Sequence, residues 1–272
     1  MSNTPVTIYG KRVSGHQYKP EKLNKPLCNG MLKKWVKIDK LDWRYLSANP
    51  YAINLLLLFP EKINWHHLSE NPEAIDLLKE NPHKINWIRI CRNPKAIDLI
   101  KDAIKNSGRM SWRELSANPS AIELLEENPE KIDWAYLSGN PSAIHLIEKE
   151  LQNGEHNRVS WSKLSVNPNA MHILEANPDK IVWDSFSRNP SAVDYFRTDT
   201  NYWYLNYEQL CLNPCAMSII EENSMMKDWT LLSRNPCAIQ MLEENQCMID
   251  WCELSKNPAI FESYDADQQF IK

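Results

Sequence analysis

The chain of 272 residues is poor in glycine, with six, and has no long apolar run. So few glycines leave no glycine-rich loop of the kind that holds phosphate groups, which argues against a nucleotide-binding enzyme. The longest apolar stretch, Ala52 to Phe59, is interrupted by Asn54 and is too short to span a bilayer. No basic-then-apolar start resembles a signal peptide. We therefore expect a soluble intracellular protein without a transmembrane segment.

Groupings of unlike chemical residues are also missing. There are seven histidines, but none lies in the last third of the chain, where five of the seven cysteines gather: Cys211, Cys215, Cys237, Cys247 and Cys252. A mixed Cys/His zinc site therefore has no support in the sequence. We expect no metal, no cofactor and no catalytic residues, and hence a protein that is not an enzyme.

What the sequence does contain is a repeated unit of about 22 residues, shown in full by Trp65 to Asn86. Ten copies account for nearly everything after about residue 35. They begin at Trp43, Trp65, Trp87, Trp112, Trp134, Trp161, Trp183, Tyr207, Trp229 and Trp251. A fixed period of this length is typical of a solenoid, in which each unit packs only against its neighbours.

Every copy carries Asn-Pro seven residues into the unit, as at Asn71-Pro72. Proline suits the first position of a helix, asparagine is among the best N-caps, and the residue before proline is pushed out of helical geometry. The residues that follow have helical spacing, as in Ala74, Ile75, Leu77 and Leu78. Asn-Pro therefore ends one short helix and starts another, and neither would be stable alone.

The first helix of each copy begins at the tryptophan, usually after a good N-cap such as Asp133. Serine follows its leucine in eight copies, and Cys91 and Cys211 fill that position in the other two. A row of nucleophiles is one interpretation of these residues. The exchange of serine for cysteine favours the other, a small residue where two helices approach closely.

These patterns predict an all-α solenoid of about ten two-helix repeats over residues 35–272, with atypical caps at its ends. Ile38 to Trp43 resembles a degenerate half-repeat, and the last copy is cut short at Pro258 to Phe261. Ten units at about 8–10 Å each predict a rod about 80–100 Å long, unless tight superhelical closure intervenes. The tryptophans should be buried between repeats rather than exposed for stacking on bases.

Residues 1–34 lack the repeat and form a basic leader. Residues 1–40 hold nine basic and two acidic residues, a balance of +7, whereas the remainder holds 22 basic and 33 acidic residues, a balance of −11. This asymmetry has two interpretations. In the first, the leader binds an anionic partner. In the second, the leader folds back on the acidic solenoid and caps its first repeat. The candidate partner-binding residues are Lys11, Arg12, Lys19, Lys22, Lys25, Lys33 and Lys34.

The signature N-P-x-A-I-x-L-L-x-x-N-P-x-K-I-x-W-x-x-L-S, carried here by Asn118 to Ser138, resembles a tandem repeat of proteins encoded by giant nucleocytoplasmic DNA viruses. The similarity covers most of residues 43–258. The resemblance implies a viral protein, located in the viral factory or in the virion as a minor capsid-associated component, with capsid proteins among its partners.

The sequence thus predicts a non-enzymatic scaffold for protein–protein interaction. The alternative is an adaptor that binds nucleic acid or a membrane surface through its basic leader.

Overall fold

The computed structural model describes residues 7–8, 11–12, 31–106, 110–196, 204–223 and 227–262. Within these ranges the secondary structure is helical, apart from one short antiparallel pair in the leader and an isolated bridge between Leu32 and Phe261. The paired strands are β1 (Thr7–Ile8) and β2 (Lys11–Arg12). The structure confirms an all-α solenoid built from ten copies of one unit.

Each repeat starts with a short inner helix at its tryptophan. These helices are α1 (Trp43–Ala48), α3 (Trp65–Leu68), the 3-10 helix η7 (Arg89–Arg92), α6 (Trp112–Ser116), α8 (Trp134–Leu137), α10 (Trp161–Val166), α12 (Trp183–Phe186), α14 (Tyr207–Leu210), α16 (Trp229–Arg234) and α18 (Trp251–Leu254). A polar residue caps most of them, as where the carboxylate of Asp133 accepts a hydrogen bond from the Tyr136 amide. The predicted N-caps are therefore confirmed.

Asn-Pro then opens a 3-10 turn, which leads into an outer helix in the first nine repeats. The outer helices are α2 (Ile53–Leu58), α4 (Ile75–Glu80), α5 (Ile97–Lys105), α7 (Ile122–Glu126), α9 (Ile144–Gln152), α11 (Met171–Glu175), α13 (Val193–Phe196), α15 (Met217–Glu222) and α17 (Ile239–Glu244). The turns are Pro50–Ala52, Pro72–Ala74, Pro94–Ala96, Pro119–Ala121, Pro141–Ala143, Pro168–Ala170, Pro190–Ala192, Pro214–Ala216, Pro236–Ala238 and Pro258–Ile260. The predicted second helix is thus a 3-10 turn followed by an α-helix.

A second 3-10 turn often returns the chain to the next inner helix. These turns are η2 (Ile38–Lys40), η4 (Pro60–Lys62), η6 (Pro82–Lys84), η10 (Pro129–Lys131), η13 (Pro178–Lys180) and η19 (Gln246–Met248). The core comes from the same positions in each unit, such as Leu137, Ala143 and Ile147, all fully buried. Because these side chains recur at the repeat period, one continuous core runs through the array.

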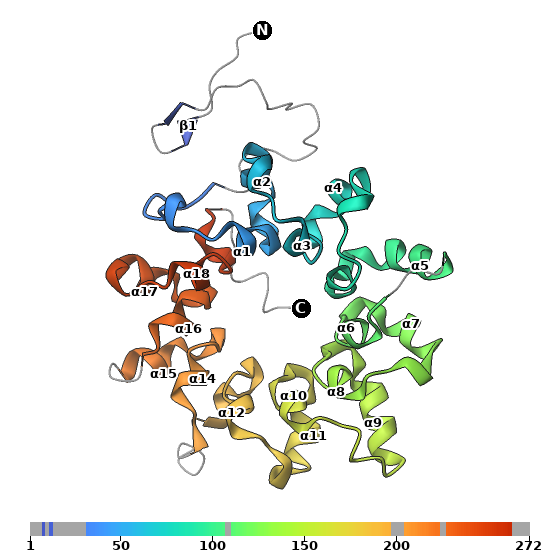
Figure 1. The fold of residues 1–272 in the computed structure, drawn as a ribbon. Helices are drawn as coiled ribbons and strands as arrows, with labels where there is room; N and C mark the ends of the chain where they lie inside the picture. The colour runs from blue at the N-terminus through green and yellow to red at the C-terminus, as the bar shows by residue number, and fades with distance from the viewer. Residues whose placement is uncertain are drawn as a thin grey trace.

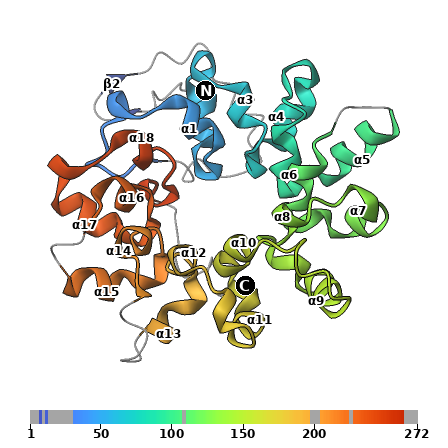
Figure 2. The same ribbon diagram turned by 60° about the horizontal axis from the view of Figure 1, so that its bottom comes forward.

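The array is a closed ring and not a rod, so the expected length of about 80–100 Å is wrong (Figure 1). The inner helices line the centre, the outer helices form the periphery, and α18 lies beside α1 (Figures 1 and 2). Neighbouring repeats are hydrogen-bonded through their inner parts, whereas the outer helices fan apart. Each unit is therefore a wedge, and ten wedges complete the circle.

The tryptophan row is half-buried against the core, which is less than the burial expected from the sequence. Basic side chains lie over the rings in several repeats: the Lys84 ammonium is 4.1 Å from the Trp65 ring centroid, and that of Lys131 is 4.5 Å from the Trp112 centroid. These contacts are cation–π interactions. The tryptophans therefore have a structural role, and their rings are partly covered.

Candidate functional site

The recurring serine links each repeat to the next. The Ser138 hydroxyl donates to the Trp134 carbonyl at 2.7 Å and accepts from the Ser160 amide of the following repeat at 2.9 Å. The side chain is fully buried. The position therefore requires more than small size: its hydroxyl satisfies two buried backbone groups. This use explains the serine row without any nucleophilic chemistry.

The Asn-Pro asparagines form a continuous ladder of hydrogen bonds. The Asn140 side-chain nitrogen donates to the carbonyls of Ser116 and Asn118, both at 3.0 Å, and its side-chain oxygen accepts from the Ser142 amide. Both N–H donors are used, and the side chain is fully buried. Each asparagine is thus an N-cap, as predicted, and also a cross-link to the preceding repeat. Such a row has no free donors for a bound peptide.

The same contacts close the ring between the last repeat and the first. The Asn49 side-chain nitrogen donates to the Ser255 carbonyl at 3.4 Å and to the Asn257 carbonyl at 3.2 Å. The Ser255 hydroxyl accepts from the Asp42 amide at 2.8 Å. These bonds reproduce those within the array across more than 200 residues of sequence. The asparagine hydrogen bonds therefore continue around the whole ring.

One of the ten repeats is split between the two ends of the array. We call it the composite repeat; it consists of 251–262 and 31–42. Backbone hydrogen bonds join the halves, from the Lys33 amide to the Ile260 carbonyl and from the Glu262 amide to the Met31 carbonyl, both at 2.8 Å. The Lys40 ammonium lies over the Trp251 ring, as that of Lys84 lies over Trp65. The degenerate half-repeat and the shortened last copy therefore complete each other.

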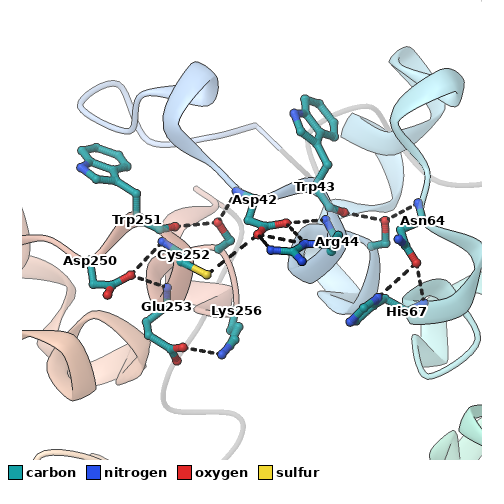
Figure 3. A network of polar contacts seen from close by, with 12 residues as sticks. Asp42, Trp43, Arg44, Asn64, His67, Asp250, Trp251, Cys252, Glu253 and Lys256 are labelled. Carbon is teal, nitrogen blue, oxygen red and sulfur yellow. Dashed lines mark hydrogen bonds and ion pairs between the residues drawn. The ribbon is translucent and has the colours of Figure 1, made fainter.

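Polar side chains meet at this closure seam (Figure 3). The Arg44 guanidinium binds the Asp42 carboxylate at 2.6 Å, and this hydrogen bond holds the pKa of Asp42 below its usual value. The Cys252 thiol lies 3.9 Å from the same carboxylate. Glu253 and Lys256 pair on the side of the helices opposite Trp251 (Figure 3). The seam is thus held by backbone hydrogen bonds and by the Asn49 and Ser255 side chains, and these two ion pairs lie beside it.

Three positions on each inner helix vary in chemistry around the ring. They are the two residues after the tryptophan and the residue before Asn-Pro, and we call them the variable positions. Repeat two has His66, His67 and Glu70 there, whereas repeat nine has Thr230, Leu231 and Arg234. Side chains of neighbouring repeats meet at these positions, as where Arg89 pairs with Glu70 at 2.5 Å. The serine and asparagine contacts that recur from repeat to repeat do not involve the side chains at these positions.

Two of the seven predicted leader residues have described side chains. Lys33 is half-buried and belongs to the composite repeat, where it borders an open hollow of about 520 Å³ lined also by Glu243 and Glu244. Lys34 is exposed. Among the described residues, the array's contacts therefore extend back to Met31, ahead of the predicted boundary, and residues 31–34 of the leader take part in closing the ring. The backbones of Lys11 and Arg12 lie in β2, and Lys19, Lys22 and Lys25 fall outside the described residues.

Four of the described thiols are poorly suited to nucleophilic chemistry. Burial raises the pKa of Cys91, Cys211, Cys215 and Cys252. A nucleophilic cysteine needs the opposite shift, because the thiolate is the reactive form. None of the six cysteines in the described ranges forms a disulfide. In the same part of the chain, no three His, Cys, Asp or Glu side chains are grouped to hold a metal ion.

Among the described helices, none is long and apolar enough to cross a membrane. Comparisons of the chain with protein-family models, with curated proteins and with solved structures found no match. The ring and the side chains that it presents are accordingly the basis for a functional proposal.

Proposed function

We propose that the protein is a non-enzymatic ring scaffold that binds other proteins through the variable positions of its inner helices. The observation that carries this proposal is the use of the recurring polar residues. Serines and asparagines, which serve as nucleophiles or ligands elsewhere, are fully buried and bonded between repeats, as Ser138 and Asn140 are. Chemical variety is left to the variable positions, where it suits recognition.

Closure of the ring favours binding as well as stability. An open solenoid can bend along its length, and a partner must then order it. A closed hydrogen-bonded ring holds its inner helices in fixed relative positions, so less conformational entropy is lost on association. Because the variable positions differ from repeat to repeat, each sector of such a ring offers a different surface.

Affinity capture with the intact protein tests the proposal, followed by cross-linking and mass spectrometry to locate contacts. Partners should cross-link to the inner helices, and substitutions at exposed variable positions, such as Arg234→Gln, should weaken capture without lowering the melting temperature. Substituting exposed outer-helix residues such as Glu126 provides the control. Capture that depends on outer helices alone would contradict the proposal.

A second candidate is an adaptor that binds nucleic acid or a membrane surface through the leader, supported by the +7 balance of residues 1–40. Replacing Lys11, Arg12 and Lys19 by glutamine should then weaken binding to anionic probes. Nucleic acid would show a steep linear fall of log affinity with log salt concentration, from counterion release. Unchanged binding by the variant would remove this candidate.

The resemblance to giant-virus repeat proteins extends the proposal to a virus particle, in which the ring would be a minor capsid-associated component. Such a component should remain with purified particles through gradient sedimentation and salt washing. Its release together with the soluble contents of infected cells would contradict this assignment.

A further inference from the structure

Several cations at or beside the variable positions are neutralised by carboxylates of the same or a neighbouring repeat. Arg89 pairs with Glu70 at 2.5 Å, and Arg92 pairs with Glu114. At the seam, Lys256 pairs with Glu253 at 2.5 Å. The charged side chains named here, on the inner helices of repeats two, three, four and ten, are therefore neutralised by ion pairs within the protein.

Three consecutive inner helices, α6, α8 and α10, are different (Figure 2). The Arg113 guanidinium lies 4.3 Å from the centroid of the Tyr136 ring, and the Lys163 ammonium lies 3.1 Å from it. Neither cation forms an ion pair within the described part of the chain. Among the other variable positions of these helices, the Glu114 carboxylate is already paired with Arg92. The rest are small or neutral: Ala117, Ala135, Gly139, Ser162 and Val166.

At position 139, glycine stands where repeat two has a carboxylate that neutralises a neighbouring cation. Gly139 and Lys163 occupy the same two positions, one repeat apart, as Glu70 and Arg89. In the earlier pair a carboxylate neutralises the cation at 2.5 Å. In the later pair the glycine supplies no carboxylate, and Lys163 passes beside it: a Cβ at position 139 would lie 3.6 Å from the Lys163 Cβ. The positive charge is therefore available to a carboxylate from outside.

We propose that Arg113, Tyr136 and Lys163 form a docking site for an acidic segment of a partner protein. This inference rests on the proposed scaffold function and names the chemistry of one of its partners. Arginine can bind a carboxylate through two parallel hydrogen bonds, and tyrosine and arginine dominate the binding energy of many protein interfaces. Both cations lie against the Tyr136 ring, so carboxylates of one segment can reach both.

The charges around the site favour an acidic protein segment over nucleic acid. A phosphate backbone is bound by cations repeated along its path, but on one flank Arg89 and Arg92 are neutralised by Glu70 and Glu114. The chain beyond residue 40 carries 22 basic and 33 acidic residues. A long polyanion would meet this negative charge, whereas a short acidic segment needs only the local pair.

The sharpest test restores the missing carboxylate. Gly139 has no positive φ, and the contacts of an added Cβ are ordinary in length, so Gly139→Glu and its neutral match Gly139→Gln should both fold. The probe is a fluorescein-labelled peptide with a run of glutamates, titrated against the full chain by anisotropy. Gly139→Glu should weaken binding by about tenfold or more, as expected for competition with a charge-assisted hydrogen bond, and Gly139→Gln should leave it nearly unchanged. Equal affinities for the two variants at unchanged melting temperature would overturn the proposal.

A second pair of variants locates the charge. Lys163→Gln should weaken peptide binding by about tenfold, whereas Arg89→Gln should have little effect, because Arg89 is already paired. Equal losses of peptide affinity in the two variants would show that the peptide responds to the overall positive charge and not to a specific site, and would overturn the proposal. Tighter binding of single-stranded DNA, lost in Lys163→Gln, would replace the acidic segment by nucleic acid and also overturn it. If the Gly139→Glu variant still captures protein partners, this site is refuted but the scaffold function is not. If the peptide binds as expected but no partner is found on the inner helices, only the scaffold function is refuted.

Discussion

The asparagine ladder can be tested at a single central rung, Asn140. Its side chain is fully buried, donates to two carbonyls of the preceding repeat at 3.0 Å and caps the Pro141–Ala143 turn. Asn140→Ala removes three hydrogen bonds and leaves the Ser116 and Asn118 carbonyls without these donors. At about 0.5–1.5 kcal/mol for each bond, plus the cost of buried carbonyls that lose a partner, the unfolding free energy should fall by about 3–5 kcal/mol.

Asn140→Asp sharpens the same test because it keeps the shape of the side chain. The carboxylate cannot donate and would face two carbonyl oxygens, so its pKa should be raised in the folded state. The ionised form destabilises the fold, and the deficit should shrink as the pH falls through the raised folded pKa, because the protonated acid regains one donor. Asn140→Ala should show no such recovery.

The assay is urea unfolding followed by tryptophan fluorescence, with hydrogen exchange to localise the effect to α6 and α8. Asn157→Ala, at an exposed loop asparagine, is the matched control and should change stability by less than about 0.5 kcal/mol. An equally small change for Asn140→Ala would refute the claim that the ladder holds the repeats together.

Three further predictions concern other parts of the repeat. Trp134→Ala should lower the free energy of unfolding by about 2–4 kcal/mol, somewhat less than the loss of a fully buried aromatic side chain, because the ring is half-buried. Urea unfolding measures this loss, and strongly red-shifted tryptophan emission from the native protein would contradict the packing. Ser138→Ala should cost about 1–3 kcal/mol while Ser138→Cys costs less, since cysteine occupies the same position in two other repeats; equal melting temperatures for the two variants would show that the hydroxyl bonds are unimportant. The hydrogen bond from Arg44 lowers the pKa of Asp42, so its stabilising effect is present above the unfolded pKa of about 4 and is lost as the pH falls through the lower folded value. Asp42→Asn should therefore reduce the acid sensitivity of the melting temperature, and an unchanged pH profile would contradict a stabilising contact between Asp42 and Arg44.

Local structure could be predicted from the sequence because its determinants are local. Asn-Pro fixes where a turn begins, and a polar residue such as Asp133 before a tryptophan fixes where an inner helix begins. Closure could not be derived this way, because it depends on a small rotation per repeat summed over ten units. The sequence nevertheless contained one signal of closure. Ile38 to Trp43 matches only the second half of a repeat, and Trp251 to Phe261 matches only the first half, so the two segments together make one repeat.

The candidate docking site was hidden for a related reason. Arg113, Tyr136 and Lys163 are distant in sequence and ordinary in type, and only stacking shows that positions one repeat apart face each other. Glycine at position 139 attracts attention only after Glu70 is known to neutralise Arg89. The leader residues, in contrast, drew attention through local charge density, and Lys33 proved to belong to the ring.

The closed ring is tested most directly by a chemical cross-link across the seam. The Asp42 carboxylate lies 3.9 Å from the thiol of Cys252, so Asp42→Cys places two thiols side by side, 210 residues apart in sequence. A short thiol-specific cross-linker should join residues 42 and 252 within one monomer, identified by mass spectrometry of the linked peptides, and Cys252→Ser should abolish the product. In an open rod of ten units these residues would lie nine repeat spacings, or about 70–90 Å, apart, and the absence of the intramolecular product from the folded monomer would contradict the ring.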